Sequence, residues 1–248
     1  MPVNRYLCYI ILLVAPLLSC KRERQPVLPQ GTDAPAKLLV LTETQGYRHE
    51  SIDAGLAMFR DNAADWGVEV THSGGSEVVT QDLNAYDLVV LLNTTGDVFT
   101  TAEQDALEQY LQQGGAIMGI HGAADAEYDW PWYGQMLGGW FDGHPEIQQA
   151  DCIVADKTHS MTAHLPSVWP RTDEWYNFRN LAADNNVLVL LDENTYSGGT
   201  HGNYHPISWY REYGGGRIFY TGMGHTSSTY SEPLFTGHIK RAIDWLVR

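Results

Sequence analysis

Short apolar runs alternate with helical patterns along this chain, and that alternation constrains its fold most. The segments KLLVLTE (37–43) and YDLVVLLN (86–93) are almost continuously apolar, as is typical of strands buried on both faces of a parallel sheet. Between them, apolar residues recur every three or four positions from Ile52 to Trp66, and Gly67 follows as a helix stop. Strands and helices in this order need right-handed crossovers. They therefore predict an α/β fold with a doubly wound, mainly parallel sheet covered by helices on both faces.

The same alternation continues to the end of the chain. Thr100 followed by Glu103 has the pattern of a capping box and predicts a helix through Gln113. A Gly-Gly pair follows, and AIMGIH (116–121) is the next predicted strand. We also predict strands at 68–73, 186–191, 207–210 and 217–222, and a final helix over 232–247.

The N-terminal segment has the pattern of a secretory signal peptide. Arg5 precedes an apolar stretch from Leu7 to Leu18, which is shorter than the about 20 residues of a membrane-spanning helix. Cys20 follows Leu-Leu-Ser, which resembles the box where bacterial lipoproteins are cleaved and lipidated. A plain secreted protein and an uncleaved signal anchor are the alternatives.

This pattern predicts how the chain is organised and where it is found. We predict an exported, membrane-anchored bacterial lipoprotein, periplasmic or on the cell surface, that touches the membrane through its lipid only. The predicted parts are a signal peptide over 1–19, lipidation at Cys20, a Pro-rich flexible tether over 20–36 and one domain over 37–248.

Cysteine content and charge exclude two further classes of protein. Once the signal is removed and Cys20 is lipidated, Cys152 alone remains, so the domain has no internal disulfide. Cys152 lies in an alternating apolar stretch, and we predict a buried strand residue rather than a nucleophile. The net charge of −15 argues against nucleic acid as a partner.

Polar residues follow several predicted strands at the point where each strand ends. Ligands of open parallel sheets bind outside the carboxyl ends of the strands. Three histidines from distant parts of the chain are therefore expected on one rim, although a single buried histidine is as often a satisfied core residue. The residues that follow these strands are Tyr47, Arg48, His49, Asn93, His121 and His225.

The middle of the chain is unusually rich in aromatic residues, which suggests the wall of a pocket. Aromatic faces stack on the C–H faces of sugars, while carboxylates and imidazoles nearby bind hydroxyl groups. The alternative is a satellite hydrophobic cluster. The candidate wall is Trp132, Trp140, Trp175 and Tyr176, with Asp125, His144, Glu174 and His205 as polar groups.

Seven segments together resemble the ThuA-like (trehalose-utilisation) family. They span the chain from Lys37 to its C-terminus and are GYRHESI, LLNTTGD, GGAIMGIHGAAD, WPWYGQMLGGWFDGHP, RTDEWYNF, HPISW and GGGRIFYTGMGHT. The resemblance implies a flavodoxin-like fold of the class I glutamine amidotransferase type. Related amidotransferases carry their nucleophilic Cys at a strand-to-helix elbow. His121 occupies that position here, so glutamine hydrolysis through a thioester is not available there.

The resemblance also implies a role in carbohydrate metabolism, with disaccharides or their 3-keto derivatives as substrates. In this hypothesis His121 acts as base or metal ligand and Glu174 as acid or orienting group. A second version is metal-dependent, with Zn²⁺ held by His121, His49 and His225. A third hypothesis is a sugar-binding lipoprotein without catalysis.

Overall fold

The computed structural model describes Met1 and residues 34–248, and Ala34–Arg248 form one compact unit. The predicted signal peptide from residue 2 onward, Cys20 and all but the last three residues of the predicted tether lie outside the described residues. Among residues 34–248, no helix combines the length and apolar character that a membrane span needs.

One large sheet forms the centre of this unit. Its first five strands run parallel, and the other four extend it in antiparallel fashion. The order across the sheet is β2 (Val68–Ser73), β1 (Ala36–Leu41), β3 (Leu88–Leu92), β4 (Ala116–Ile120), β11 (Gly216–Thr221), β10 (His205–Tyr213), β9 (Asn186–Asp192), β6 (Gln148–Val154) and β7 (Val168–Asp173). A separate two-stranded sheet pairs β5 (Trp140–Phe141) with β8 (Phe178–Arg179).

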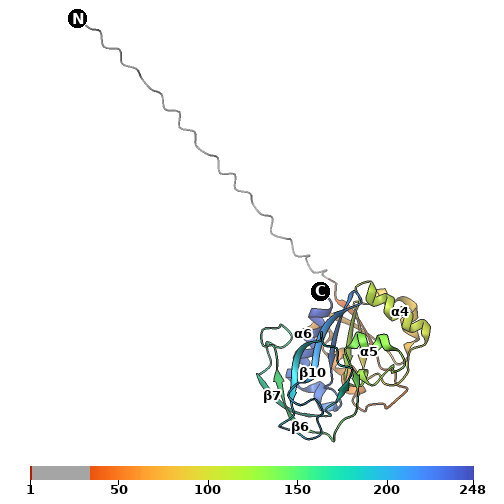
Figure 1. The fold of residues 1–248 in the computed structure, drawn as a ribbon. Coiled ribbons are helices and arrows are strands. Elements are labelled where there is room, and N and C mark those ends of the chain that lie inside the picture. Colours follow the sequence, from red (N-terminus) through yellow and green to blue (C-terminus); the bar gives the residue numbers. More distant parts are fainter. Residues whose placement is uncertain (2–33) are drawn as a thin grey trace. The chain divides into compact units, whose positions relative to one another are not determined.

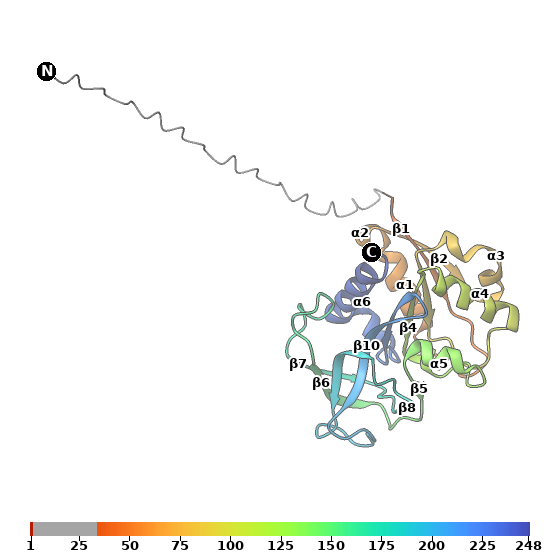
Figure 2. The same cartoon turned by 45° about the horizontal axis from the view of Figure 1, so that its top comes forward.

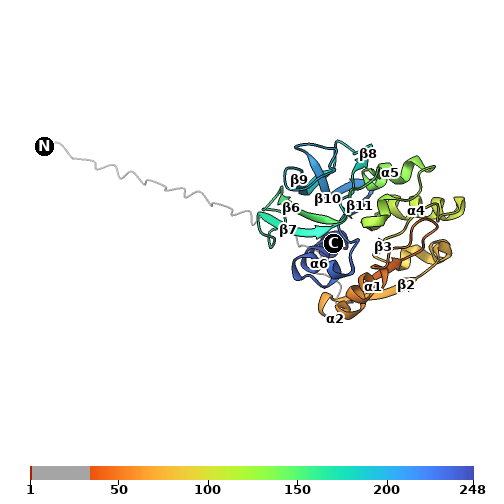
Figure 3. The same cartoon turned by 90° about the horizontal axis from the view of Figure 1, so that it is seen from below.

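Helices cover both faces of the sheet, as the alternation of elements predicted. Figure 3 shows α1 (Ile52–Asp61) and α6 (Pro233–Leu246) on one face and α4 (Thr101–Gln112) and α5 (Pro131–Leu137) on the other. The antiparallel strands β6, β7 and β10 lie at one side of the domain and α4 lies at the other (Figures 1 and 2). Short helices are α2 (Ala63–Trp66), α3 (Val79–Asp82) and the 3₁₀ turns η1 (Ser76–Val78), η2 (Leu83–Ala85), η3 (His121–Ala124) and η4 (Ser227–Ser231).

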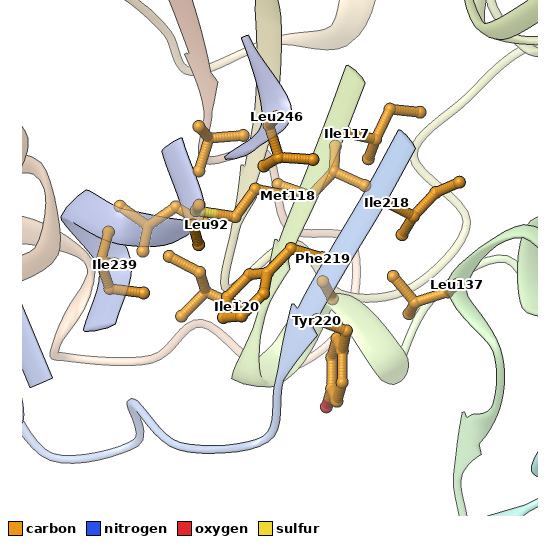
Figure 4. Packing of buried hydrophobic residues seen from close by; sticks show 14 of the residues in the cluster. Leu92, Ile117, Met118, Ile120, Leu137, Ile218, Phe219, Tyr220, Ile239 and Leu246 are labelled. Carbon is orange, nitrogen blue, oxygen red and sulfur yellow. The ribbon is translucent and has the colours of Figure 1, made fainter. Parts of the chain in front are cut away.

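The core includes the two neighbouring parallel strands β4 and β11. Met118 and Phe219 of these strands are fully buried. Figure 4 shows Ile239 and Leu246 of α6 on one side of β4 and β11 and Leu137 of α5 on the other. Burying one such side chain contributes about 1.5–3 kcal/mol. This apolar packing fixes the strands whose ends carry the candidate site.

The direction of the strands brings one end of the domain together. β10 runs against β11, β9 against β10, β6 against β9 and β7 against β6. After these four reversals, β7 points the same way as the parallel strands. Its carboxyl end therefore lies at the same edge of the sheet as the carboxyl ends of β1, β4 and β11.

Most predicted elements are confirmed, and the differences have physical reasons. The capping box at Thr100 and Glu103 is present, with Thr100 N donating to Glu103 Oε2 at 2.7 Å. The predicted helix over 51–66 is divided at Asn62, whose side-chain amide donates to Met58 O and competes with the helical pattern. Cys152 is fully buried on β6, and burial raises its pKa to about 12, as expected for an inert strand residue.

Candidate functional site

His121 stands at the sharp turn that ends β4. It adopts a φ of 44°, an uncommon backbone conformation for a residue with a side chain. The Nδ1–H of its ring donates to Gly222 O at 2.7 Å, and the hydroxyl of Tyr220 donates to His121 O at 3.0 Å. Because a carbonyl can only accept, this bond places the proton on Nδ1 and leaves the lone pair of a neutral ring on Nε2.

The residue after His121 allows neighbouring loops to approach closely. A Cβ at Gly122 would lie 3.1 Å from both Asn93 Cα and His49 Cε1, so a larger residue would push these groups away. Gly122 N also donates to Asn93 Oδ1 at 3.1 Å. The glycine turn thus brings the end of β4 against the loop that carries His49.

Four side chains converge at this edge of the sheet, and we call them the site group: His49, His121, Glu174 and His225. The three imidazole rings form a triangle with centroids 4.9, 5.1 and 5.2 Å apart. Glu174 Oε2 lies 3.4 Å from His121 Nε2 and 3.2 Å from His225 Nδ1. One potential ligand atom from each of the four residues lies within 4.8 Å of the others. The four residues follow β1, β4, β7 and β11.

Burial and mutual contact set the charges of the site group. Burial, reinforced by nearby His121 and His225, lowers the pKa of His49 to about 3, so this ring is neutral at physiological pH. Contact with the Glu174 carboxylate raises the pKa of His225 and outweighs the effect of burial. Burial alone would raise the pKa of Glu174, but the imidazoles of His121 and His225 hold it below its usual value. The site group therefore combines the carboxylate of Glu174 with the neutral imidazole of His49 and with the imidazole of His225, which takes up a proton more readily than usual.

A cavity of about 420 Å³ opens beside the site group. Asp125 stands on its wall, where burial raises its pKa although the hydroxyl of Tyr128 donates to it at 2.6 Å. His144 lies at the rim with Nδ1 3.2 Å from Glu174 Oε1. The lining residues are Tyr47, His49, Asp125, Phe141, His144, Glu174, Tyr176 and His225.

The donor set of the site group fits a divalent transition metal. His49 Nδ1, His121 Nε2 and His225 Nδ1 are buried and make no hydrogen bond of acceptable geometry. Most buried polar atoms have a hydrogen-bond partner, and a bound ion is one way to satisfy nitrogens that converge without one. Neutral imidazole and carboxylate are typical zinc ligands, and ligand atoms about 2.0–2.1 Å from a tetrahedral ion lie about 3.4 Å from one another. A small movement of the side chains would allow one ion to bind all four.

The structure brings together most of the residues predicted for the site. His121 lies at the floor, fully buried, and contacts the cavity-lining residues Glu174 and Tyr176. The other predicted residues that line the cavity are Tyr47, His49, Asp125, His144, Glu174, Tyr176 and His225.

Three polar residues that we predicted for the site, Arg48, Asn93 and His205, do not line the cavity. Their positions correct the prediction that they bind the substrate. Arg48 is exposed and donates to Thr42 O. Asn93 is buried behind the floor and braces the turn at Gly122. His205 is fully buried, with Nδ1 2.7 Å from Glu193 Oε1 and Nε2 2.8 Å from Tyr176 O, so its ring has partners on both sides.

The predicted wall of tryptophans is also misplaced. Trp175 is fully buried and donates its indole N–H to Gln148 O. Trp140 packs against Gly134 in the core, and Trp132 stacks on Trp130 at 4.9 Å. None of the three lines the cavity; Trp175 belongs to the main hydrophobic core, and Trp132 packs against it.

The aromatic residues that line the cavity are the predicted Tyr47 and Tyr176, together with Phe141. Phe141, which belongs to the same aromatic-rich stretch, lies 4.2 Å from Tyr176 between ring centroids. Phe141 is the last residue of β5, and its place in the aromatic-rich stretch close to His144 was the available signal. The other missed residue is Asp173, which is fully buried and binds the loop that carries His225.

Comparisons with known proteins agree with this architecture. No curated protein matches the sequence. A solved ThuA-like protein from Bacteroides uniformis is 25% identical, with a TM-score of 0.73 over 89% of this chain and 95% of the other. A ThuA-like protein from Parabacteroides merdae is 20% identical, with a TM-score of 0.72 over 86% of this chain and 90% of the other.

One more distant similarity concerns the fold alone. A β-galactosidase from Rahnella matches over 85% of this chain but only 32% of its own, at 13% identity and a TM-score of 0.57.

The family model described as ThuA, trehalose utilisation, matches residues 37–246. That range includes every residue of the site group and of the cavity, and the chain therefore belongs to the ThuA family.

Proposed function

We propose that this protein is a carbohydrate-processing enzyme that acts on disaccharides or their 3-keto derivatives and uses a divalent metal held by the site group. One observation carries the proposal. Three buried imidazole nitrogens without hydrogen-bond partners and one carboxylate converge beside a cavity of about 420 Å³. The family description, trehalose utilisation, supplies the substrate class.

His49, His121, Glu174 and His225 would hold the metal, which when bound would polarise a carbonyl or hydroxyl oxygen of the sugar. The hydrogen bond from His121 Nδ1 to Gly222 O fixes the ring and keeps Nε2 directed at Glu174. Glu174 Oε2 faces the imidazoles and Oε1 faces His144, so one carboxylate joins the floor to the rim.

Other cavity residues would bind the sugar and move its protons. Asp125 is half-buried with a raised pKa, which suits a group that exchanges a proton with a substrate near neutral pH. His144 at the rim would be a further polar contact for the sugar. Phe141, Tyr176 and exposed Tyr47 offer aromatic faces to the C–H face of a sugar ring.

The test is a product assay with a panel of disaccharides and their 3-keto forms, followed by mass spectrometry. Chelator-washed wild-type protein should be inactive, and stoichiometric Zn²⁺ or another divalent ion should restore its turnover. The His121→Ala variant should remain inactive after the same ion is added. Full activity of washed protein, confirmed as metal-free by elemental analysis, would contradict the metal. Saturable binding without product across the panel would favour a non-catalytic sugar-binding protein.

We also propose that the protein is exported and anchored to a membrane through lipid on Cys20. The pattern from Arg5 to Cys20 supports this. Wild-type protein expressed in a bacterium should partition into detergent with the membrane fraction, and Cys20→Ala should not be lipidated. Equal partition of both proteins into the aqueous phase would rule out the anchor.

A further inference from the structure

We propose that Asp173 is the positioning residue that holds Glu174 and His225 together, and this inference rests on the metal centre proposed above. Asp173 is the last residue of β7, and its side chain is fully buried. It belongs neither to the site group nor to the residues that line the cavity. Its role is to fix the positions of Glu174 and His225 without contacting the metal or the substrate itself.

The carboxylate of Asp173 is surrounded by donors from two segments of the chain. Oδ1 accepts from Glu174 N at 3.1 Å and His225 N at 3.1 Å. Oδ2 accepts from Gly224 N at 3.0 Å and from the hydroxyl of Thr229 at 3.1 Å. Thr226 N at 3.4 Å and Arg171 Nη2 at 3.3 Å complete the set.

These bonds join two elements that the sheet keeps apart. Glu174 follows β7 at the edge of the sheet, and His225 follows β11, with β10, β9 and β6 between the two strands. Asp173 alone accepts from the backbone N–H groups of both ligand residues. Glu174 Oε2 and His225 Nδ1 lie 3.2 Å apart as a result.

The rest of the inner face of β7 strengthens this junction. Alternate residues of β7 are buried, and Trp169 Nε1 donates to Glu232 Oε1 at 2.7 Å. Arg171 Nη1 pairs with Glu232 Oε2 at 3.3 Å, and Arg171 Nη2 donates to the Thr229 hydroxyl at 2.9 Å. The end of β7 is thereby docked onto the segment between β11 and α6.

An amide would not replace this carboxylate. Both oxygens of Asp173 only accept, and every neighbour within hydrogen-bond distance donates. In Asp173→Asn, an NH₂ group would face donors on one side, including the Arg171 guanidinium. The backbone of Gly224, or that of Glu174 and His225, would then have to shift away.

The experiment measures Zn²⁺ affinity of chelator-washed, full-length protein by competition with a chromophoric chelator, and the visible spectrum of the Co²⁺ form. Asp173→Asn should bind Zn²⁺ about 10- to 100-fold more weakly, the range for partners that orient metal ligands, and should change the Co²⁺ spectrum. Thr229→Val removes one donor from Asp173 and should weaken binding about fivefold, as expected for one hydrogen bond.

The matched control is Glu127→Gln. Glu127 is also buried and accepts from the backbone of Val98 and Phe99 at 2.7 and 2.9 Å, but it contacts no member of the site group. Its substitution should lower stability and leave Zn²⁺ affinity and the Co²⁺ spectrum unchanged.

Each outcome decides between the two proposals. Wild-type protein that takes up neither ion would refute the metal centre, and the role of Asp173 with it. Wild-type protein that binds Zn²⁺ while Asp173→Asn binds it equally well, with the same Co²⁺ spectrum, would overturn the role of Asp173 alone. If Asp173→Asn does not fold, unchanged Zn²⁺ affinity in Thr229→Val would overturn it.

Discussion

Two histidine–glutamate clusters of this protein differ in how the ring nitrogens of their histidines are satisfied. In the buried pair, His205 and Glu193, both ring nitrogens of the histidine have a partner, at 2.7 and 2.8 Å. In the site group, His121 bonds Gly222 O through Nδ1, while Nε2 has no hydrogen bond. Because an unsatisfied buried polar atom is costly, the first arrangement stabilises the fold, whereas the second fits the metal centre that we propose.

The largest expected effect separates the two glutamates. Glu174→Ala should lower kcat on an established sugar substrate by about 10²- to 10⁴-fold, because it removes the carboxylate that contacts His121, His225 and His144. Glu193→Ala should leave kcat within the range of wild type while lowering Tm. Steady-state kinetics of both variants test this difference, and equal losses of kcat would show that the two clusters have the same role.

Metal binding should stabilise only protein with an intact site group. Adding Zn²⁺ at about 1,000 times its Kd to chelator-washed protein should raise the free energy of unfolding by about 4 kcal/mol. His225→Ala should lose most of this gain, because it removes a nitrogen without a hydrogen-bond partner. His205→Gln should keep the gain, although its stability without metal is lower. Urea unfolding with and without Zn²⁺ measures both, and loss of the gain in His205→Gln would contradict the comparison.

The sequence predicted the site as far as strand order allowed. His49, His121 and His225 follow strands whose apolar runs are clear, so their meeting at one edge could be inferred from parallel topology alone. The role of β7 could not, because VWPRTD mixes Pro and charged residues and has no apolar run. Its inner residues Arg171 and Asp173 are buried only through partners distant in the sequence.

The tryptophans show a second reason why part of the site could not be predicted from the sequence. Their number suggested a pocket wall, but whether an aromatic ring lies in a cavity or in the core depends on what packs against it. Trp175 is fully buried and bonds Gln148 O. Phe141, a single inconspicuous residue, lines the cavity instead. The sequence therefore identified Tyr47 and Tyr176 at the cavity, but composition could not separate Phe141 from the tryptophans that pack elsewhere.

Another satisfied histidine gives a pH-dependent prediction away from the site group. His238 is fully buried, with Nδ1 2.9 Å from Met161 O and Nε2 3.0 Å from Ser208 Oγ, and burial lowers its pKa to about 4. Below pH 6.5 the unfolded chain binds a proton there that the folded protein does not. The contribution of His238 to the free energy of unfolding is therefore fully present above about pH 6.5 and decreases as the pH falls toward 4. At pH 5 the loss from this residue is about 2 kcal/mol.

His238→Gln removes this titration and provides the measurement. Urea unfolding of chelator-washed protein at pH 8 and pH 5 should show an acid-induced loss that is smaller by about 2 kcal/mol in the variant than in wild type. Other buried histidines, such as His49, contribute equally to both proteins. An identical loss in both would mean that His238 is protonated in the folded state.

The smallest expected effects come from two tyrosines, one beside each cluster. Tyr196 OH lies 2.9 Å from His205 Nδ1, and Tyr128 OH donates to Asp125 Oδ1 at 2.6 Å. Tyr196→Phe should lower the free energy of unfolding by about 1 kcal/mol, because it removes one hydrogen bond of the buried His205 ring, and leave kcat unchanged, because His205 does not line the cavity.

Tyr128→Phe should change the pH dependence of kcat and leave the free energy of unfolding nearly unchanged. Its side chain is exposed, so stability changes little, but Asp125 loses a hydrogen bond that favours its charged form. The pKa of Asp125 then rises further, and because the carboxylate is the form that accepts a proton, the acid limb of the kcat–pH profile should move to higher pH. An unchanged profile together with a clear loss of stability would place Tyr128 and Asp125 with the structural pair and remove Asp125 from the proposed chemistry.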